Sequence, residues 1–247
     1  MRTLHAALVV AAIMAGRPGP ARAEDLTIVS SVTTPRGMTR TQTQYLSPSR
    51  VRLSGEERDT IVDLTSGRIT ILDNRHKEYS ETTLDELQAF LGQIDSAMAG
   101  RSVFDRSVGA TASVTVEKGT AGKKVAGYDT DHYILTLGES MRMDVWTTTA
   151  LEPPARYFDA RKVVYASLGP MARRFDRLYD EMKKINGFPL ASTVDYRLRV
   201  SRRQVSTEAT EVRKGPIAES VFAAPAAYKK VESPFGGNRP PAPRPSP

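Results

Sequence analysis

The sequence predicts a mainly β domain of the α+β class, built around an antiparallel sheet with a few helices. Apolar residues recur with a period of two over most of residues 26–83, as in strands that bury one face. The runs are short and separated by turn residues, which leaves no room for the crossover helices that parallel strands need. The period becomes helical in two further segments, residues 84–98 and 157–185.

The strands predicted before the first helix form a meander, because each follows the previous one after a tight turn. In the first of them, Leu26, Ile28 and Val32 alternate with polar residues. The next runs are MTRTQTQYL, RVRLSG, DTIVDLTSG, RITILDN and HKEYSET, separated by Ser47-Pro48, Gly55, Ser66-Gly67 and Asp73-Asn74.

The helical segments carry their own start and stop signals. Thr83 and Glu86 form a capping-box pattern before the first helix, and Gly100 ends it. A helical hairpin is predicted after Pro153-Pro154, with Gly169-Pro170 as its turn. The remaining strands are predicted in ASVTVEK, KKVAGYDTDHYILTLGESMRMDVWTTT and STVDYRLRVSRRQVSTEATEVRK.

The two ends of the chain predict export and a disordered tail. Residues 1–23 have a positive start, a short apolar run and the small-x-small pattern Ala21-Arg22-Ala23, so we expect a signal peptide cleaved after Ala23. A retained membrane anchor is the alternative, but Gly16 to Pro20 would break its helix early. The proline-rich residues 233–247 should be disordered, which leaves residues 24–232 as one domain in the periplasm or beyond it.

The charge balance limits the kinds of molecule that we expect the protein to bind. The chain has 35 Lys and Arg against 28 Asp and Glu, a net charge of +7, and loss of three arginines with the signal would leave +4. An exported protein rarely meets nucleic acid, so we expect none as a partner. An anionic membrane surface suits the surplus better. The absence of cysteine excludes thiol chemistry and disulfides.

One polar cluster raises the question of catalysis, because Asp129, Asp131 and His132 lie within four residues. Neighbours in a strand point to opposite faces, so His132 should lie opposite the two acids. We therefore expect the polar start of a strand and no metal site. Asp63 and Asp73 are expected to form turns, and we find no catalytic or cofactor motif in the sequence.

A set of motifs resembles a known family. The motifs are DLTSGRITILDNRHKEYSETTLDEL, KKVAGYDTDHYILTL with MRMDVWTTT, GFPLASTVDYRLR and ESVFAAPAAYKKVE, the last being similar to a closing F-x-x-P-x-x-Y-K-x-V signature. Together they resemble an exported bacterial family, the domain of unknown function 4412, which is similar in layout to the LolA/LolB-like carriers of lipoproteins and lipids. Ala227 departs from the glycine that usually precedes the signature tyrosine.

The resemblance implies a curved antiparallel sheet, an open half-barrel of LolA type, with helices covering its concave face. It also implies hydrophobic binding of a lipid or another apolar small molecule, without catalysis or a cofactor. We expect nine residues to line the cavity, although each could instead be packed core: Leu87, Phe90, Leu91, Met141, Met143, Val145, Phe175, Leu178 and Met182.

Three functions follow from the sequence. The first is a periplasmic carrier of an apolar ligand. The second is an envelope sensor or adaptor that binds a protein partner. The third is a hydrolase with an unrecognised site. An open apolar cavity favours the first, an exposed apolar patch favours the second, and a polar cleft with converging acids favours the third.

Overall fold

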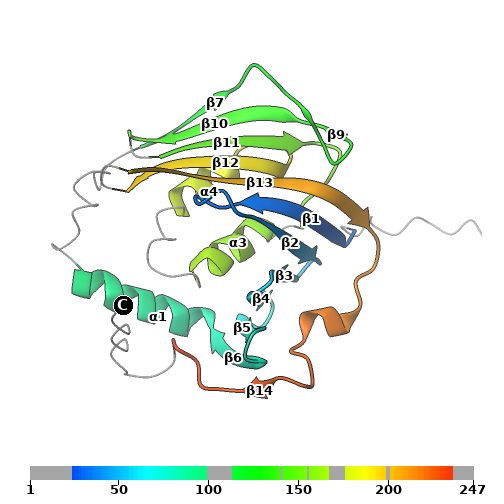
Figure 1. The fold of residues 1–247 in the computed structure, drawn as a ribbon, viewed down its shortest axis with the longest axis vertical. Helices are drawn as coiled ribbons and strands as arrows, with labels where there is room; N and C mark the ends of the chain where they lie inside the picture. Colours follow the sequence, from blue (N-terminus) through cyan, green and yellow to red (C-terminus); the bar gives the residue numbers. More distant parts are fainter. Residues whose placement is uncertain are drawn as a thin grey trace, which may run out of the picture.

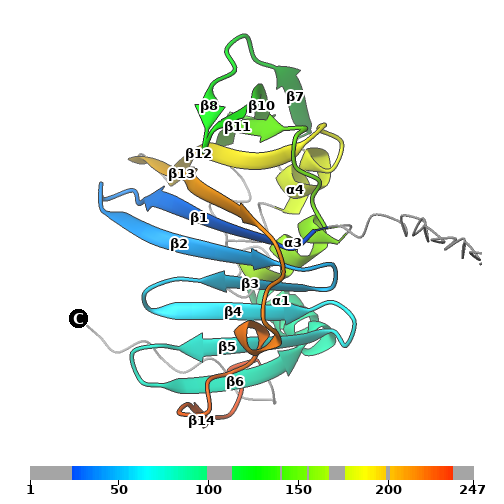
Figure 2. The ribbon, with the colours of Figure 1, turned by 90° about the vertical axis from the view of Figure 1, so that its right-hand side faces the viewer.

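Twelve strands of the computed structural model form one curved sheet (Figures 1 and 2). The structure describes residues 24–98, 113–139, 141–154, 156–166, 176–198 and 201–235. The strand order is β14-β6-β5-β4-β3-β2-β1-β13-β12-β11-β10-β7. The pairs are antiparallel except β14 with β6, which are parallel. The predicted fold class, an open curved antiparallel sheet with a few helices, is confirmed.

The strand bounds agree with the predicted runs. The first half of the sheet is β1 (Leu26–Thr33), β2 (Thr39–Leu46), β3 (Arg50–Ser54), β4 (Arg58–Asp63), β5 (Arg68–Asp73) and β6 (Glu78–Thr83). The second half is β7 (Val114–Lys118), β10 (Asp131–Leu137), β11 (Met141–Thr148), β12 (Phe188–Leu198) and β13 (Ser201–Lys214). The short strands are β8 (Lys124–Val125) and β9 (Tyr128–Asp129), which pair with each other, and β14 (Lys229–Lys230).

The two halves are joined at β1, which pairs with β2 on one side and with β13 on the other. Alternation in β1 turns Leu26 and Ile28 into the core, where they are buried with Leu46 of β2 and Ala209 of β13. The core therefore continues from one half of the sheet into the other on the concave face.

The helices α1 (Leu84–Met98), α3 (Tyr157–Ala166) and α4 (Asp176–Met182) lie on the concave side of the sheet (Figure 1). The capping box of α1 is confirmed, because the Thr83 N–H donates to Glu86 Oε2 at 3.0 Å and the Glu86 N–H donates to Thr83 Oγ1 at 3.2 Å. None of the described helices combines the length and the apolar character needed to cross a membrane.

Residues 216–231, which we call the strap, cross the convex face of the first half of the sheet (Figure 2). Arg50 forms an ion pair with Glu219 of the strap, and Arg52 donates a hydrogen bond to the Val221 carbonyl at 2.6 Å. The strap then adds β14 to the outer side of β6. The strap therefore covers both a face and an edge of this half.

Four predicted features lie outside the described residues. They are the signal peptide in residues 1–23, the helix stop at Gly100, the hairpin turn at Gly169-Pro170, and residues 236–247 of the predicted tail.

Candidate ligand-binding site

Strands β10 and β11 place a row of apolar side chains on the concave face of the sheet. Leu135 pairs with Met143, and Leu137 pairs with Met141. These four side chains and Val145 are buried, because alternation turns every second residue of each strand toward the helices. We call Leu135, Leu137, Met141, Met143 and Val145 the floor.

Helix α4 lies over the floor, whereas α3 lies over β3 and β4 of the first half, and we call the two helices the lid (Figure 1). Leu178 and Met182 of α4 are buried in one cluster with the floor. Val164 of α3 is buried in the adjoining cluster, and the half-buried Phe158 packs against both clusters. The underside of the lid is therefore mainly apolar, with one polar contact from Arg161 of α3 to the buried Gln44 of β2, where Nη1 lies 3.4 Å from Oε1.

Polar contacts hold the lid to the sheet at its two ends. Just before α3, Arg156 donates a hydrogen bond to the Leu64 carbonyl at 2.5 Å. Just after α4, the Thr147 hydroxyl donates to the Asn186 carbonyl at 2.8 Å. Gly187 follows with a φ of +97°, and a Cβ there would lie 2.7 Å from the Thr148 carbonyl oxygen. The position therefore requires glycine.

Ion pairs across the outer surface join the two helices of the lid to each other. Lys162 of α3 pairs with Asp180 of α4, and Lys183 Nζ lies 2.6 Å from Asp159 Oδ1. The hydrogen bond to Asp159 raises the pKa of Lys183, so this lysine stays charged at neutral pH. These pairs make the two helices one unit, whereas the apolar underside supplies the contacts with the floor.

The nine residues predicted to line a cavity separate into groups. The structure places Met141, Met143 and Val145 in the floor, with Leu178 and Met182 of the lid packed on them. Leu87 and Leu91 of α1 are buried elsewhere, against Ile69 and Ile71 of β5, and Phe90 packs at the border of that cluster. Phe175 lies outside the described residues. Ligand binding by these residues stays a prediction.

The polar cluster on β9 and β10 is split as predicted. Asp129 pairs with Lys124 at 3.0 Å and Asp131 pairs with Lys118 at 3.3 Å. His132 points to the opposite face, where its Nε2 lies 2.8 Å from Asp144 Oδ1. Alternation in β10 therefore turns the imidazole away from Asp131, and Asp129 belongs to the separate hairpin of β8 and β9.

His132 is held in a tight local packing on the convex face. Its ring stacks on Trp146, with centroids 4.7 Å apart and planes at 8°. On the other side a Cβ at Gly119 would lie 2.1 Å from the ring Nδ1, so that position must stay glycine. The Lys123 ammonium lies 4.4 Å from the centroid of Trp146. His132 therefore packs between Gly119 and Trp146, with its side chain only 13% exposed.

Asp144 is the charged partner of this packing. Arg142 donates to its two oxygens, from Nε at 2.8 Å and from Nη2 at 2.9 Å. Burial by itself would raise the pKa of Asp144, but hydrogen bonds from Arg142 and His132 outweigh burial and lower the pKa below its ordinary value of 3.8. Asp144 is therefore an ionised structural group at neutral pH and is unsuited to act as a general acid.

The other acids that the sequence singled out form turns. Asp63 accepts hydrogen bonds from the N–H groups of Thr65 and Ser66, and Asp73 accepts from those of Arg75 and His76. The turn-forming roles predicted for Asp63 and Asp73 are confirmed.

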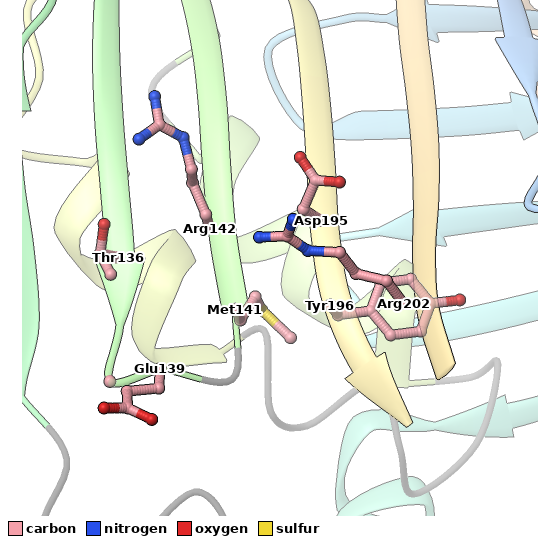
Figure 3. A pocket seen from close by; sticks show the side chains of 8 residues that line it. Thr136, Glu139, Met141, Arg142, Asp195, Tyr196 and Arg202 are labelled. Atoms are coloured by element: carbon pink, nitrogen blue, oxygen red, sulfur yellow. The ribbon is translucent and has the colours of Figure 1, made fainter. Parts of the chain in front are cut away.

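A small pocket of about 220 Å³ lies where β11 begins and β12 ends (Figure 3). Arg142 and Arg202 supply positive charge to its lining, and Glu139 and Asp195 supply negative charge. Figure 3 shows the two carboxylates on opposite sides of the pocket. Asp195 accepts a hydrogen bond from Gln204 at 3.2 Å. The acids do not converge, so this pocket lacks the arrangement that would favour a hydrolase.

The family model of a domain of unknown function, DUF4412, matches residues 31–228, which is most of the chain. The chain belongs to the DUF4412 family. The resemblance stated from the motifs is thereby confirmed. No curated protein matches the sequence.

Three solved structures resemble this DUF4412 chain at low sequence identity. PNGF-II shares 11% identity with a TM-score of 0.40, over 85% of this chain and 31% of that chain. The MucA/MucB complex of Pseudomonas aeruginosa shares 15% identity with a TM-score of 0.42, over 85% of this chain and 59% of that chain. The LolA superfamily protein NE2245 from Nitrosomonas europaea shares 6% identity with a TM-score of 0.28, over 83% and 91%.

This DUF4412 chain thus spans less than two thirds of the first two of these proteins. Each TM-score is below 0.5, so we assign the fold from the sheet order and helix packing described above.

Sequence reasoning missed two features of this DUF4412 domain. The first is the stack of His132 on Trp146, which lie on neighbouring strands as cross-strand partners. The register of β10 with β11 decides that pairing, and the short loop between the two strands was the one sequence signal that could have indicated the register. The second is the strap, whose contacts with the sheet join residues about 150 or more positions apart, such as Arg50 and Glu219.

Proposed function

We propose that this domain is an exported, non-enzymatic carrier that binds an acyl chain or a similar apolar ligand between the lid and the floor. The proposal rests on one observation. Ion pairs join the two helices of the lid to each other, whereas the lid contacts the floor through apolar side chains. Displacement of α4 from the floor would open the site, while α3 stays packed in the adjoining cluster and the lid stays bonded to the sheet through Arg156 and Asn186.

The energetics of such a site are hydrophobic. Each buried methylene contributes roughly 0.8 kcal/mol, so about ten methylenes of an acyl chain would contribute on the order of 8 kcal/mol before the costs of association. Met141, Met143 and Met182 meet at the interface of lid and floor. Their unbranched side chains can repack around a ligand more easily than β-branched ones.

The lysines on the outer surface of the lid have acidic partners within the lid. Lys184 pairs with Glu181 at 2.7 Å, as Lys162 and Lys183 pair with Asp180 and Asp159. We therefore assign the binding energy to the apolar underside, not to a basic rim that attracts anionic head groups. Delivery to the periplasm rests on the signal peptide predicted in residues 1–23.

The experiment compares uptake of a fluorescent fatty-acid probe by the wild type and by Met143→Trp. The larger side chain occupies the space between floor and lid, so uptake should be lost while the free energy of unfolding in urea changes by less than about 1 kcal/mol. Ile134→Trp is the matched control, because Ile134 lies on the opposite face of the neighbouring strand β10. This control should keep full uptake.

Two results would reject the carrier. One is a wild type that takes up no probe and yields no lipid in a native mass spectrum. The other is a Met143→Trp variant destabilised by about 1–3 kcal/mol, as in an overpacked core, with uptake unchanged.

A further inference from the structure

Strand β7 forms one edge of the sheet, and its outer side has no strand partner among the described residues. Its side chains are mostly exposed, and Val116 is one of two large apolar side chains exposed in the described part of the chain, at 38%. The opposite edge is different, because β14 of the strap pairs with β6. An exposed edge of this kind is a template for another strand.

The register with β10 determines which backbone groups of β7 are open. The Gly119 N–H donates to the His132 carbonyl at 2.8 Å, and the pairs of an antiparallel ladder alternate between bonded and non-bonded. Thr115 and Glu117 are therefore bonded to β10. The N–H and C=O groups of Val114, Val116 and Lys118 point away from the sheet.

We propose that this edge pairs with β7 of a second copy of the chain, antiparallel and with the two-fold axis at Val116. This register places Val116 opposite itself, Thr115 opposite Glu117, and Val114 opposite Lys118. All three outward-pointing residues of each strand then bond to the partner, which gives about six hydrogen bonds, two for each bonded pair.

The side chains select this register over its neighbours. A shift in one direction places Glu117 directly opposite Glu117 of the second copy, and like charges in that position repel. A shift in the other direction leaves Lys118 opposite no residue of β7, so that only two of the three outward-pointing residues of each strand bond to the other β7. The strand pattern is thus self-complementary in one register, which is why we assign a second copy to the edge in place of an extended peptide from another protein.

The interface is short, so the dimer should be weak. A five-residue ladder buries less than the ~1,200 Å² that stable complexes need. We expect a monomer–dimer equilibrium that depends on protein concentration.

Sedimentation equilibrium over a concentration series tests the proposal with two variants at one position. Val116→Pro removes the outward N–H and leaves the bonds of Thr115 and Glu117 to β10 in place, as proline at an edge strand allows. It should remain a monomer at every concentration, with unchanged circular dichroism. Val116→Thr keeps the N–H and should dimerise like the wild type.

Cross-linking tests the register, because the chain has no cysteine of its own. Val116→Cys should form a disulfide-linked dimer under oxidation, since Val116 faces itself across the axis. Thr115→Cys should cross-link far less, since it faces Glu117. A wild type that stays monomeric, a dimer that survives Val116→Pro, or equal cross-linking at both positions would overturn the proposal. A monomer that binds only foreign extended peptides at β7 would overturn it too.

Discussion

Both halves of the sheet carry helices on the concave face, but they differ on the convex face and at the edge. The first half is covered by the strap and closed by β14, through contacts between residues far apart in the sequence. In the described part of the chain the second half ends at β7, and its convex face is held by near neighbours such as Arg142 and Asp144. The polar contacts of the first half therefore join the two ends of the chain, whereas those of the second half join residues closer in sequence, from Arg142 with Asp144 to Lys123 with Glu208.

Each half has a hydrogen-bonded carboxylate on its convex face, buried in the first half and partly buried in the second. Asp59 of β4 is 1% exposed and accepts hydrogen bonds from Arg52, Ser54 Oγ, the Gly55 N–H and Asn74 Nδ2. Arg52 also reaches the strap through the Val221 carbonyl. Asp144 has a 15% exposed side chain and two charged or chargeable partners. The Asp59 network is thus larger and drier.

Of the predicted changes, replacement of these two acids should lower the free energy of unfolding most. The two losses compare how strongly each half depends on its carboxylate. We expect Asp59→Ala to lower the free energy of unfolding by about 3 kcal/mol, because Arg52 and Asn74 lose a buried partner. Asp144→Ala should lower it by about 1 kcal/mol, since Arg142 can turn to water. Urea unfolding followed by circular dichroism measures both. If the two variants lost equal free energy of unfolding, the first half would depend no more on Asp59 than the second half depends on Asp144.

A pair of glycines compares the turns of the two halves. Gly187 at the base of the lid has positive φ and backbone atoms in the way of a Cβ, whereas Gly37 between β1 and β2 has a φ of +77° and open space around it. Gly187→Ala should therefore cost about 2 kcal/mol or more, and Gly37→Ala about 1 kcal/mol. Thermal unfolding of both variants tests this. A Gly37 variant as unstable as the Gly187 variant would contradict the steric explanation.

Most strands and helices were predictable because the sequence patterns that produce them involve residues close together in the chain. Alternation in β1 and the capping box of Thr83 and Glu86 depend on residues within one or two turns of each other, and both are found as expected. The pairing of β1 with β13 was not predictable in this way. It joins Leu26 to Lys214, and many other strand pairings would satisfy the same alternation.

The candidate site was predictable in part for the same reason. Helical spacing indicated that Leu87 and Leu178 each face inward, and both are buried. It carried no information on which strand each helix would meet. Leu87 packs against β5 and Leu178 against β10 and β11, so a single cavity lined by both helices could not be inferred from periodicity.

The smallest expected effect is the response of the two halves to acid and salt. The pKa of Asp144 is lowered because the hydrogen bonds from Arg142 and His132 outweigh burial, which acts in the opposite direction. The pKa of Asp63 is also lowered, because hydrogen bonds, led by the Ser66 and Thr65 N–H groups, outweigh burial. A carboxyl with a lowered folded pKa stabilises the fold above its unfolded pKa, and this contribution is lost as pH falls through the folded value.

The advantage of the wild type over Asp144→Asn, and over Asp63→Asn, should therefore shrink between about pH 5 and pH 2. The two variants should differ in salt. High salt screens the charge of Arg142 and should reduce the advantage conferred by Asp144 at neutral pH, whereas the backbone bonds of Asp63 respond less. Urea unfolding of the wild type and both variants across this pH range tests the pH effect. The same measurement at low and high salt at neutral pH tests whether Asp144 is more sensitive to salt than Asp63. If salt reduced both advantages equally, the second half would not owe its polar stability to local ion pairs, and the contrast between the two convex faces would fail.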